Sequence, residues 1–469
     1  MMAAELEHSP QVGDIISLNV QETVSADFLG VLDLRLIERL RLLPERRSVW
    51  KTECQGVAIL LKLYVPHPKQ ERDIGREWHH SVELQEAGLE IPPPLFIARG
   101  DGELRAVGFH FIEGGATIDS LLETEDRGLP QQILTQLVAL HRRQHEAGWF
   151  QRDDHLGNYL WSQGKLWMLD AGSFEFSSSP LPERERLANM ALLAANIPLP
   201  LKFKFNQAMS SVYGRALVGF DSAAKAAIHT RIRNYYKKTR RACTEFEHVK
   251  SGRKSWLACR DINEELKLKL LSDPDQFFDG ESLVKNGNTC TVVEVSEAGR
   301  SYILKRYNQK SLMYRLTHCF MTPRALLSWS NGHVLRLFGV STPRPVACLL
   351  LRAGQLVQRG YLLMEKVDAT RLSDVDSSRM SNSSLEIPVQ FAEVWRHLDA
   401  LDATHGDMKA SNFMVDAEGG VSLIDLDSLE FHRTDYGKRS SQTKDMTRFM
   451  RNWEMSPKVK SAFKQAVDR

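Results

Sequence analysis

Hydrophobic residues in the first half of the chain form two strand-like runs. Residues 49–53 and 57–63 are rich in aliphatic and β-branched side chains, and Cys-Gln-Gly at 54–56 is typical of a turn between strands. Consecutive apolar residues before Lys62 indicate a strand that is buried on both faces. We therefore expect a β-hairpin whose second strand carries Lys62. Residues 1–30 have no clear period and stay unassigned.

A segment of helical spacing follows this hairpin. Ile74, Trp78 and Val82 recur at helical intervals, and Gly88 with the prolines at 92–94 ends the segment. Glu77 lies in the middle of this predicted helix, and we expect it to pair with Lys62; a solvated surface glutamate is the alternative. Further on, residues 107–112 predict a strand, 113–115 (Glu-Gly-Gly) a hinge, 131–145 a helix and 166–169 a strand.

The second half repeats this pattern. Residues 291–295 and 302–304 predict strands that lead to Lys305, and residues 361–364 predict another. Between the strand at 302–304 and the strand at 361–364 we expect a helix that is capped by Thr322, has Pro323 in its first turn and stops at Gly339. The loop before the first of these strands contains small residues whose backbone N–H groups could lie over phosphates. These residues are Asn286, Gly287 and Asn288.

Two polar motifs of the same design follow the predicted helices. A phosphotransferase needs a carboxylate that orients the attacking hydroxyl, an amide that holds metal, and a second metal-holding carboxylate at a strand end. The second half has H-G-D-M-K-A-S-N and then L-I-D, which supply Asp407, Asn412 and Asp425. The first half has Q-R-D-D-H-L-G-N and then W-M-L-D, which supply Asp153, Asn158 and Asp170. A single D-x-x-x-x-N is common in loops, but two complete sets with nearly equal spacing indicate a tandem duplication.

Each half departs from the kinase pattern at one place. The turn at 44–48 in the first half contains no glycine that could cover phosphates, and its Arg46 and Arg47 are better interpreted as solvated side chains than as phosphate ligands. In the second half Ser328 replaces Glu77, and no Asp or Glu occurs between residues 306 and 364. The partner of Lys305 is then a strand carboxylate, an orienting Asn331, or absent because nucleotide binds differently. The strand carboxylates are Glu294 and Glu297.

The two catalytic loops also differ in one basic position. Lys409 follows Asp407 by two residues and could neutralise the transferred phosphoryl group, whereas the first half has His155 at this position. We interpret Ser411 and Asp427 as loop and strand-end residues.

Composition and charge restrict the class of protein. A chain of 469 residues with 42% hydrophobic and 26% charged residues is typical of a soluble two-domain protein. Its six dispersed cysteines indicate reduced thiols and no zinc site, and we expect neither a signal peptide nor a membrane span. Residues 231–254 contain nine Lys or Arg and two Glu, which suits either a solvated helix face or an anionic membrane surface. We expect no nucleic-acid partner, because no binding motif accompanies this charge.

With these residues described, the chain resembles the Kdo/WaaP-type lipopolysaccharide core kinases, which are bacterial relatives of protein kinases. The resemblance covers about residues 40–453. The matching motifs are V-A-I-L-L-K-L-Y, R-E-W, H-E-A-G-W-F-Q-R-D-D-H-L-G-N, A-C-T-E-F, V-S-T-P-R-P-V-A, H-G-D-M-K-A-S-N and K-D-M-T-R-F. The resemblance implies an α+β fold with two tandem kinase-like domains, 31–255 and 256–469, each with a small sheet-rich lobe and a helical lobe.

The resemblance also implies a function. We expect ATP- and Mg²⁺-dependent phosphorylation of an inner-core heptose or Kdo hydroxyl, in the cytoplasm at the inner-membrane surface, with a lipopolysaccharide core glycolipid as substrate and other core-assembly enzymes as partners. One domain could instead be a pseudokinase. The alternatives are a non-catalytic scaffold of core assembly and a small-molecule kinase of the aminoglycoside or choline type.

The expected site residues fall into three groups. Asp153, Asp407 and Lys409 act on the transferred group. Nucleotide is held by Lys62, Glu77, Lys305, Asn286, Gly287 and Asn288. Metal is held by Asn158, Asp170, Asn412 and Asp425.

Overall fold

The computed structural model describes residues 10–43, 46–122, 128–214, 217–278, 283–287, 289–308, 322–353 and 356–469. The chain divides into two compact units. Unit 1 comprises Met1–Ile197 and Leu201–Ala224, and unit 2 comprises Pro198–Pro200 and Lys225–Arg469. The expected boundary between domains at 255/256 falls within strand β13 (Lys254–Cys259) of unit 2, and the domain limits stay a prediction.

A closed barrel forms the sheet-rich part of unit 1, with the strand order β1-β2-β3-β4-β6-β5. Its hairpin between β3 and β4 turns at Gln55 and Gly56, which both have positive φ, as a two-residue hairpin turn requires. Residues 1–30, which show no clear hydrophobic period, contain strand β1. This strand closes the barrel by pairing with β5. The strands are β1 (Ile15–Thr23), β2 (Val31–Leu43), β3 (Arg47–Cys54), β4 (Val57–Tyr64), β5 (Pro94–Arg99) and β6 (Arg105–His110).

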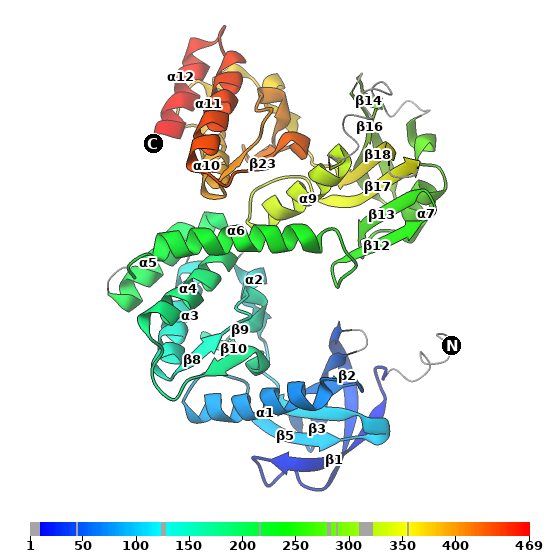
Figure 1. Ribbon diagram of the computed structural model, residues 1–469, viewed down its shortest axis with the longest axis vertical. Helices are drawn as coiled ribbons and strands as arrows, with labels where there is room; N and C mark the ends of the chain where they lie inside the picture. Colours follow the sequence, from blue (N-terminus) through cyan, green and yellow to red (C-terminus); the bar gives the residue numbers. More distant parts are fainter. Residues whose placement is uncertain are drawn as a thin grey trace. The chain divides into compact units, whose positions relative to one another are not determined.

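Strand β4 is buried on both faces, as its apolar run predicts. Ile59, Leu61 and Leu63 belong to the barrel core. The residues between them point to the other face, because side chains alternate along a strand. Helix α1 (Gln70–Glu86) covers that face with Ile74 and Trp78. Figure 1 shows the helix running across the strands of the barrel. Lys62 is thereby directed toward α1.

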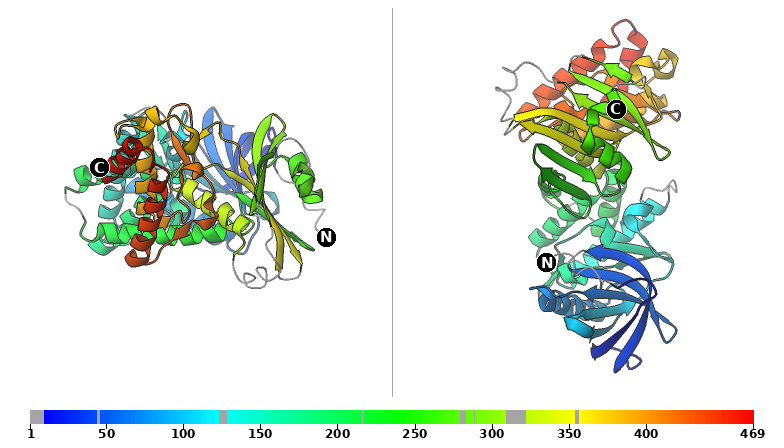
Figure 2. Two further views of the ribbon diagram at one scale, coloured as in Figure 1. Left: turned by 90° about the horizontal axis from the view of Figure 1, so that it is seen from above. Right: turned by 90° about the vertical axis from the view of Figure 1, so that its right-hand side faces the viewer.

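The helical part of unit 1 has its own core, separate from the barrel core. The right-hand view of Figure 2 shows the strands of the barrel curling round one another at one end of this unit. Small hairpins lie among the helices and carry the catalytic motif. The elements are α2 (Ile118–Leu121), α3 (Leu129–Glu146), α4 (Glu183–Asn196), α5 (Lys202–Tyr213), β7 (Ala116–Thr117), β8 (Trp149–Gln151), β9 (Tyr159–Ser162), β10 (Lys165–Met168) and β11 (Phe174–Phe176), with 3₁₀ turns at Asp101–Glu103, Leu156–Asn158, Ala171–Ser173 and Leu199–Leu201.

Unit 2 is built on a seven-stranded sheet of order β12-β13-β17-β18-β16-β15-β14. One face packs against α7 (Glu264–Ser272) and the other against α9 (Arg324–Leu337), which explains why its central strands are apolar at consecutive positions. By the same alternation Leu304 faces α7 and Lys305 faces α9. The strands are β12 (Phe246–Ser251), β13, β14 (Leu283–Asn286), β15 (Cys290–Glu297), β16 (Arg300–Tyr307), β17 (Pro345–Ala353) and β18 (Leu356–Glu365).

The helical part of unit 2 packs around an aromatic cluster. Phe391 stacks on Phe449 with ring centroids 4.1 Å apart, and Phe413 and Phe463 contact both rings. The elements are α6 (Phe220–Lys238), which contains the division between the units, α10 (Glu386–Ala400), α11 (Asp435–Arg451), α12 (Pro457–Asp468), β19 (Thr370–Arg371), β20 (Ala403–Thr404), β21 (Phe413–Val415), β22 (Val421–Leu423) and β23 (Glu430–Phe431), with 3₁₀ turns at Pro274–Phe278, Leu372–Asp374, Ser377–Met380, Ala410–Asn412 and Leu426–Ser428.

The start of α9, the state of the cysteines and the expected lack of a membrane span can each be compared with the structure. Helix α9 begins after Pro323, whose side chain makes no capping bond, so the prediction that Thr322 caps it is wrong; the helix ends just before Gly339, as expected. Five cysteines lie in the described part of the chain, and all five are free thiols. Within the same ranges, no helix combines the length and the apolar character that crossing a membrane requires.

Candidate active sites

The two catalytic loops have the same internal hydrogen bonds. In unit 1 the Asn158 amide nitrogen donates to the backbone oxygen of Asp153 at 2.8 Å. In unit 2 Asn412 makes the corresponding bond to the Asp407 oxygen, also at 2.8 Å. Each bond fixes the amide beside the backbone of the acidic residue, so each loop presents both groups together.

The hairpin after each loop brings the second carboxylate to the same place. The backbone N–H of Leu169 donates to the Asn158 oxygen at 2.9 Å, and that of Ile424 donates to the Asn412 oxygen at 2.9 Å. Because Asp170 and Asp425 are the next residues, both predicted triads come together within their own units.

In unit 1 the strand lysine, Lys62, has the expected partner. Lys62 forms a buried ion pair with Glu77 and also donates to the Leu169 oxygen at 3.1 Å. Burial raises the pKa of Glu77, and the charge of Lys62 opposes this rise. The bond to Leu169 ties the β4 lysine to the residue before Asp170. The alternative of a solvated Glu77 is therefore wrong.

Two further residues shape this carboxylate cluster. Arg47, interpreted from sequence as solvated, instead lies 3.2 Å from Asp170. Burial opposes ionisation of Asp170, but the charges of Lys62 and Arg47 keep its pKa below the usual range. Gly172 donates its N–H to Glu77 at 3.2 Å, and a Cβ there would lie 3.0 Å from the same oxygen. The glycine thus permits a close approach and does not adopt the left-handed conformation.

In unit 2, where the helix glutamate is missing, Lys305 has partners that the sequence did not predict. The Lys305 ammonium lies 2.5 Å from Asp425 and 4.0 Å from Asp427. Burial opposes ionisation of Asp425, but Lys305 lowers its pKa. Burial, together with the charge of Asp425, raises the pKa of Asp427. The interpretation of Asp427 as a mere strand-end residue is wrong, since it is buried beside Lys305 and lies 2.5 Å from Arg324 of α9.

The proposed substitutes for the glutamate have other partners. Glu294 pairs with Lys366, and Glu297 pairs with Lys269. Asn331 donates to the backbone oxygens of Leu426 and Leu429 at 2.8 and 3.1 Å. Both carboxylates lie on the strand preceding β16, but their ion pairs direct them away from Lys305. Asn331 nevertheless supports the site indirectly, because its bonds hold the turn after Asp425.

The two metal-type carboxylates differ in backbone conformation. Asp425 has φ 63° and ψ 58°, a left-handed conformation that few residues other than glycine adopt. Asp170 has φ −132° and ψ 87°. Such local strain concentrates at functional sites. Of these two carboxylates, Asp425 of unit 2 is the one that has it.

The acidic residues of the two loops also differ in surroundings. Asp407 lies 3.0 Å from Lys409 and 2.5 Å from Arg448, with 23% of its side chain exposed. Asp153 lies 3.9 Å from His155 and is 70% exposed. Lys409 is thus close enough to contact a group held at Asp407, and its catalytic role stays a prediction. Arg448 was not identified from the sequence as a site residue.

Helix α11 supplies a second residue that sequence reasoning did not identify. The buried Asp445 carboxylate accepts from the backbone N–H groups of His405 and Gly406 at 2.8 and 3.1 Å. In unit 1 Asn189 of α4 occupies this position and accepts from the Gln151 N–H at 3.3 Å. The signal in the sequence is the K-D-M-T-R-F segment, which contains both Asp445 and Arg448 but carries no spacing rule that assigns them roles.

The predicted phosphate loop is only partly described. The Gly287 N–H donates within the loop to the Cys290 oxygen at 3.1 Å, and Asn286 lies exposed in β14. Asn288 lies outside the described residues. The role of these three residues in phosphate binding stays a prediction.

The side chains of each triad fit Mg²⁺ by their chemistry. One carboxylate and one amide supply hard oxygen ligands, and Mg²⁺ in kinases completes its shell with waters and phosphates. No cluster of three His, Cys, Asp or Glu side chains with metal-binding geometry occurs among the described residues. Asn158 with Asp170, or Asn412 with Asp425, would share the ion with nucleotide.

The basic segment 231–254 is partly used in internal contacts. Burial lowers the pKa of Arg231 to about 10. Arg240 packs over Tyr236 and donates to Ser330 at 3.1 Å, while Lys238 pairs with Glu245. Lys254 donates to the backbone oxygen of Leu271. The other five basic side chains are exposed on α6, directly after it and on the β12–β13 hairpin: Arg233, Lys237, Arg241, Lys250 and Arg253.

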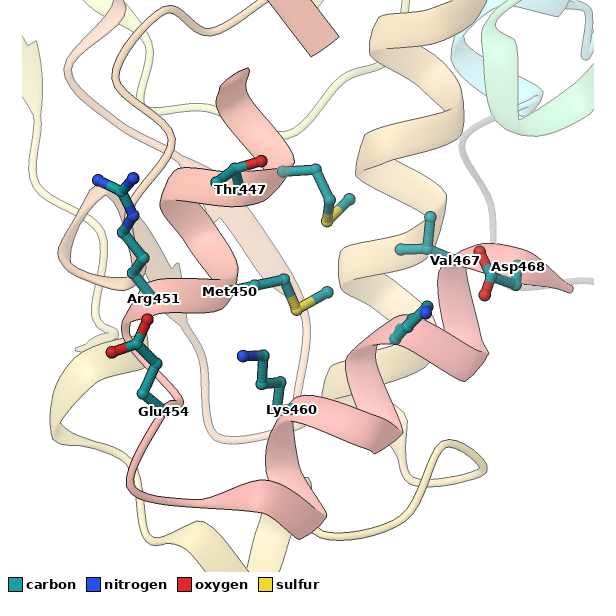
Figure 3. A pocket seen from close by; sticks show the side chains of 9 residues that line it. Thr447, Met450, Arg451, Glu454, Lys460, Val467 and Asp468 are labelled. Atoms are coloured by element: carbon teal, nitrogen blue, oxygen red, sulfur yellow. The ribbon is translucent and has the colours of Figure 1, made fainter. Parts of the chain in front are cut away.

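The hollow between α11 and α12 shown in Figure 3 has a volume of about 410 Å³. Met450 points into it, whereas Arg451 and Glu454 lie at its side. It contains none of the predicted site residues.

Comparison with known proteins gives matches to lipopolysaccharide kinases. The model of the Lipopolysaccharide kinase (Kdo/WaaP) family matches residues 279–466. A 3-deoxy-D-manno-octulosonic acid kinase of Photobacterium profundum is 36% identical over 20% of this chain and 39% of that protein. The corresponding kinase of Vibrio vulnificus is 26% identical over 26% of this chain and 54% of that protein.

The chain thus spans between about two fifths and just over half the length of these curated relatives. A solved ROP18 kinase domain in complex with AMP-PNP and sucrose is 10% identical, covers 46% of this chain and 87% of that chain, and has a TM-score of 0.32. The family match identifies a kinase-like fold for the matched segment, in a chain of mixed helix and sheet content.

Proposed function

Because residues 279–466 belong to the Lipopolysaccharide kinase (Kdo/WaaP) family, we propose that this chain transfers the γ-phosphoryl group of ATP to a sugar hydroxyl of the lipopolysaccharide core. The observation that carries the proposal is the agreement between this match and the constellation of Asp407, Asn412 and Asp425 within the matched segment. The named activity of the two relatives, an octulosonic acid kinase, supports an acidic core sugar as acceptor.

We assign catalysis to unit 2, with Asp407 as the base. Its loop has Lys409 within 3.0 Å of the carboxylate, and the following carboxylate, Asp425, has the left-handed backbone. Asp153 of unit 1 is more exposed and has a histidine in place of Lys409. We propose that unit 1 is a second kinase-like domain that holds nucleotide or substrate, in a tandem arrangement of two bilobal domains.

The proposed reaction is a balanced displacement at phosphorus. Asp407 accepts the proton of the acceptor hydroxyl while that oxygen bonds to the γ-phosphorus. The bond between the γ-phosphorus and the β–γ bridging oxygen breaks, and ADP leaves with its electron pair. Lys305 offsets charge on the phosphates, and Lys409 offsets charge on the transferred group. Asn412 and Asp425 would hold Mg²⁺, which neutralises phosphate charge when bound.

We further propose that the enzyme works in the cytoplasm at the inner-membrane surface, where a core glycolipid is accessible. The five exposed basic residues of the 231–254 segment support docking to an anionic surface, since each cation near such a surface contributes about 1 kcal/mol. A choline or aminoglycoside kinase needs no such surface. The scaffold alternative retains the same docking but no transfer.

The test is transfer of labelled phosphate from γ-labelled ATP to an unphosphorylated core oligosaccharide. We expect wild-type protein to label it and Asp407→Asn to reduce the rate by about 10²–10⁴-fold, as loss of a general base does. Asp374→Asn, an exposed acidic position of unit 2, is the matched control. Equal labelling by wild type and Asp407→Asn would refute the assignment of the base, and no labelling by wild type would favour the scaffold.

A further inference from the structure

The carboxylate that the proposed reaction uses as a base lies between two cations. Arg448 Nη2 lies 2.5 Å from Asp407 Oδ1, and Lys409 Nζ lies 3.0 Å from Oδ2. The arginine side chain is 52% exposed and that of Asp407 23% exposed, so solvent and ligand reach the arginine, whereas Asp407 Oδ1 itself is buried. Both oxygens of the base are therefore occupied at the surface where an acceptor would bind.

A guanidinium remains charged at all accessible pH values and contacts carboxylates through a planar fork of donors. The half-exposed Arg448 can therefore contact an anionic group of a ligand that is bound beside Asp407.

Unit 1 shows that the arginine is not needed to hold a catalytic loop. Asn189 and Asp445 make matching contacts with the first residue of their loops, so the two helices can be aligned on these positions. Three residues later α4 has Leu192 and α11 has Arg448. The loop of unit 1 nonetheless keeps the amide-to-backbone bond at the same 2.8 Å. Arg448 therefore adds a contact for something other than loop geometry.

We propose that Arg448 binds the carboxylate of an acidic acceptor sugar whose hydroxyl lies at Asp407. The inference rests on the proposed function and adds the recognition group for its substrate. It makes Arg448 a specificity-determining residue that separates acidic from neutral acceptors. An oxyanion of the nucleotide γ-phosphate has the same chemistry, so the experiment must distinguish the two sources.

The experiment compares two acceptors with full-length variants. One acceptor is a core oligosaccharide ending in 3-deoxy-D-manno-octulosonic acid, and the other is the same oligosaccharide with its carboxylate reduced to an alcohol. Arg448→Gln should raise KM for the acid about 10- to 100-fold, the effect of losing one charged hydrogen-bonded pair, and leave KM for the alcohol and for ATP unchanged. Arg448→Lys should recover part of the affinity for the acid, because it restores the charge without the fork.

Arg451→Gln is the matched control, because Arg451 is an exposed arginine one turn further along α11, at the side of the hollow in Figure 3. It should leave both KM values unchanged. An equal rise in KM for both acceptors, or a rise in KM for ATP alone, would overturn the inference. So would a faster reaction of Arg448→Gln with both acceptors, because the arginine would then only mask the base. Absence of transfer by wild type to either acceptor would instead overturn the proposed function, and direct titration of the acid acceptor against wild type and Arg448→Gln would still decide whether Arg448 binds it.

Discussion

At the scale of single residues, the helix that follows each strand lysine determines the partner of that lysine. Helix α1 supplies a carboxylate for Lys62, and helix α9 supplies none for Lys305. Where α1 carries Glu77, Lys62 pairs with it and Asp170 receives Arg47. Where α9 carries Ser328, that hydroxyl lies 2.9 Å from the Tyr307 hydroxyl and Lys305 lies against Asp425. In unit 1, Lys62 and Asp170 thus form ion pairs with different residues. In unit 2, Lys305 and Asp425 form an ion pair with each other.

The buried pair of unit 1 gives a stability prediction. Glu77→Gln removes the counter-charge that contacts buried Lys62 and leaves that ammonium with neutral acceptors, such as the Leu169 oxygen. Removal of one member of a buried ion pair typically costs about 3–5 kcal/mol, so the free energy of unfolding should fall by that order. Denaturant unfolding measures it. Glu83→Gln, an exposed change on the same helix, should shift it by less than about 0.5 kcal/mol; equal effects would show that the Lys62–Glu77 pair is not formed.

A buried histidine of unit 2 gives a pH prediction. His333 packs against Trp329 and Phe246 at centroid distances of 4.2 and 4.7 Å. Burial, with the charges of Arg344 and Arg336, lowers its pKa to about 3. A lowered histidine pKa means that the unfolded chain binds more protons between about pH 6.5 and 3, so stability falls as the pH falls through this window.

At pH 5 the loss from His333 should be about 2 kcal/mol relative to neutral pH. His333→Gln should make the unfolding free energy less dependent on pH between 7 and 5 by this amount. His79→Gln, at an exposed position, should leave the pH dependence as it is in wild type. A His333→Gln slope equal to that of wild type would contradict the burial of a neutral imidazole.

At the scale of elements, the catalytic loop of unit 2 depends on a helix that follows it by some thirty residues. Asp445 of α11 accepts two loop N–H groups, and Phe449 one turn later packs into the aromatic cluster. The cluster fixes the helix, and the helix fixes the loop. Packing and site geometry are therefore linked through α11.

This link gives a prediction for α11. Asp445→Ala leaves the buried N–H group of His405 and the partly buried N–H group of Gly406 without their acceptor, at about 1–3 kcal/mol for a buried unpaired group. We expect lower stability and a decrease in kcat that exceeds any change in KM for ATP. Lys444→Ala, an exposed neighbour on the same helix, serves as control in unfolding and transfer assays. Normal kcat in Asp445→Ala would show that the loop holds its conformation without α11.

Elements could be predicted from sequence where a local period determines them. The hairpin of β3 and β4, helix α1 and the pair β15 and β16 follow from alternation, turn residues and helical spacing, and the structure confirms them. The order of Asp, Asn and Asp in each half likewise predicted which residues meet. Strand β1 could not be predicted, because its burial alternates only weakly and depends on β5, which is distant in sequence.

The partners that complete the site could not be predicted, because they come from distant elements. Arg448 reaches Asp407 from α11, Arg324 reaches Asp427 from the start of α9, and Arg47 reaches Asp170 from β3. A surface arginine is the commoner case, and no local spacing separates these three from the others. Tertiary packing alone determines which arginines turn inward.

At the scale of the whole molecule, the same order of elements occurs in both units. A strand pair that carries the lysine is followed by a helix, two more strands, a long helix, the catalytic loop and a short hairpin. The family match lies in the second of these series. Different partners around the lysine, the base and the second carboxylate lead us to propose that the two units have different roles.

We propose that Asp407, and not Asp153, is the working base in lipopolysaccharide core phosphorylation. The most direct measurement is the core phosphate content of lipopolysaccharide from cells that depend on wild-type protein, Asp407→Asn, Asp153→Asn or the double variant, at equal protein levels. We predict loss of the phosphate in Asp407→Asn and in the double variant, and near-normal phosphate in Asp153→Asn. Normal phosphate in Asp407→Asn, or loss in Asp153→Asn alone, would contradict the account.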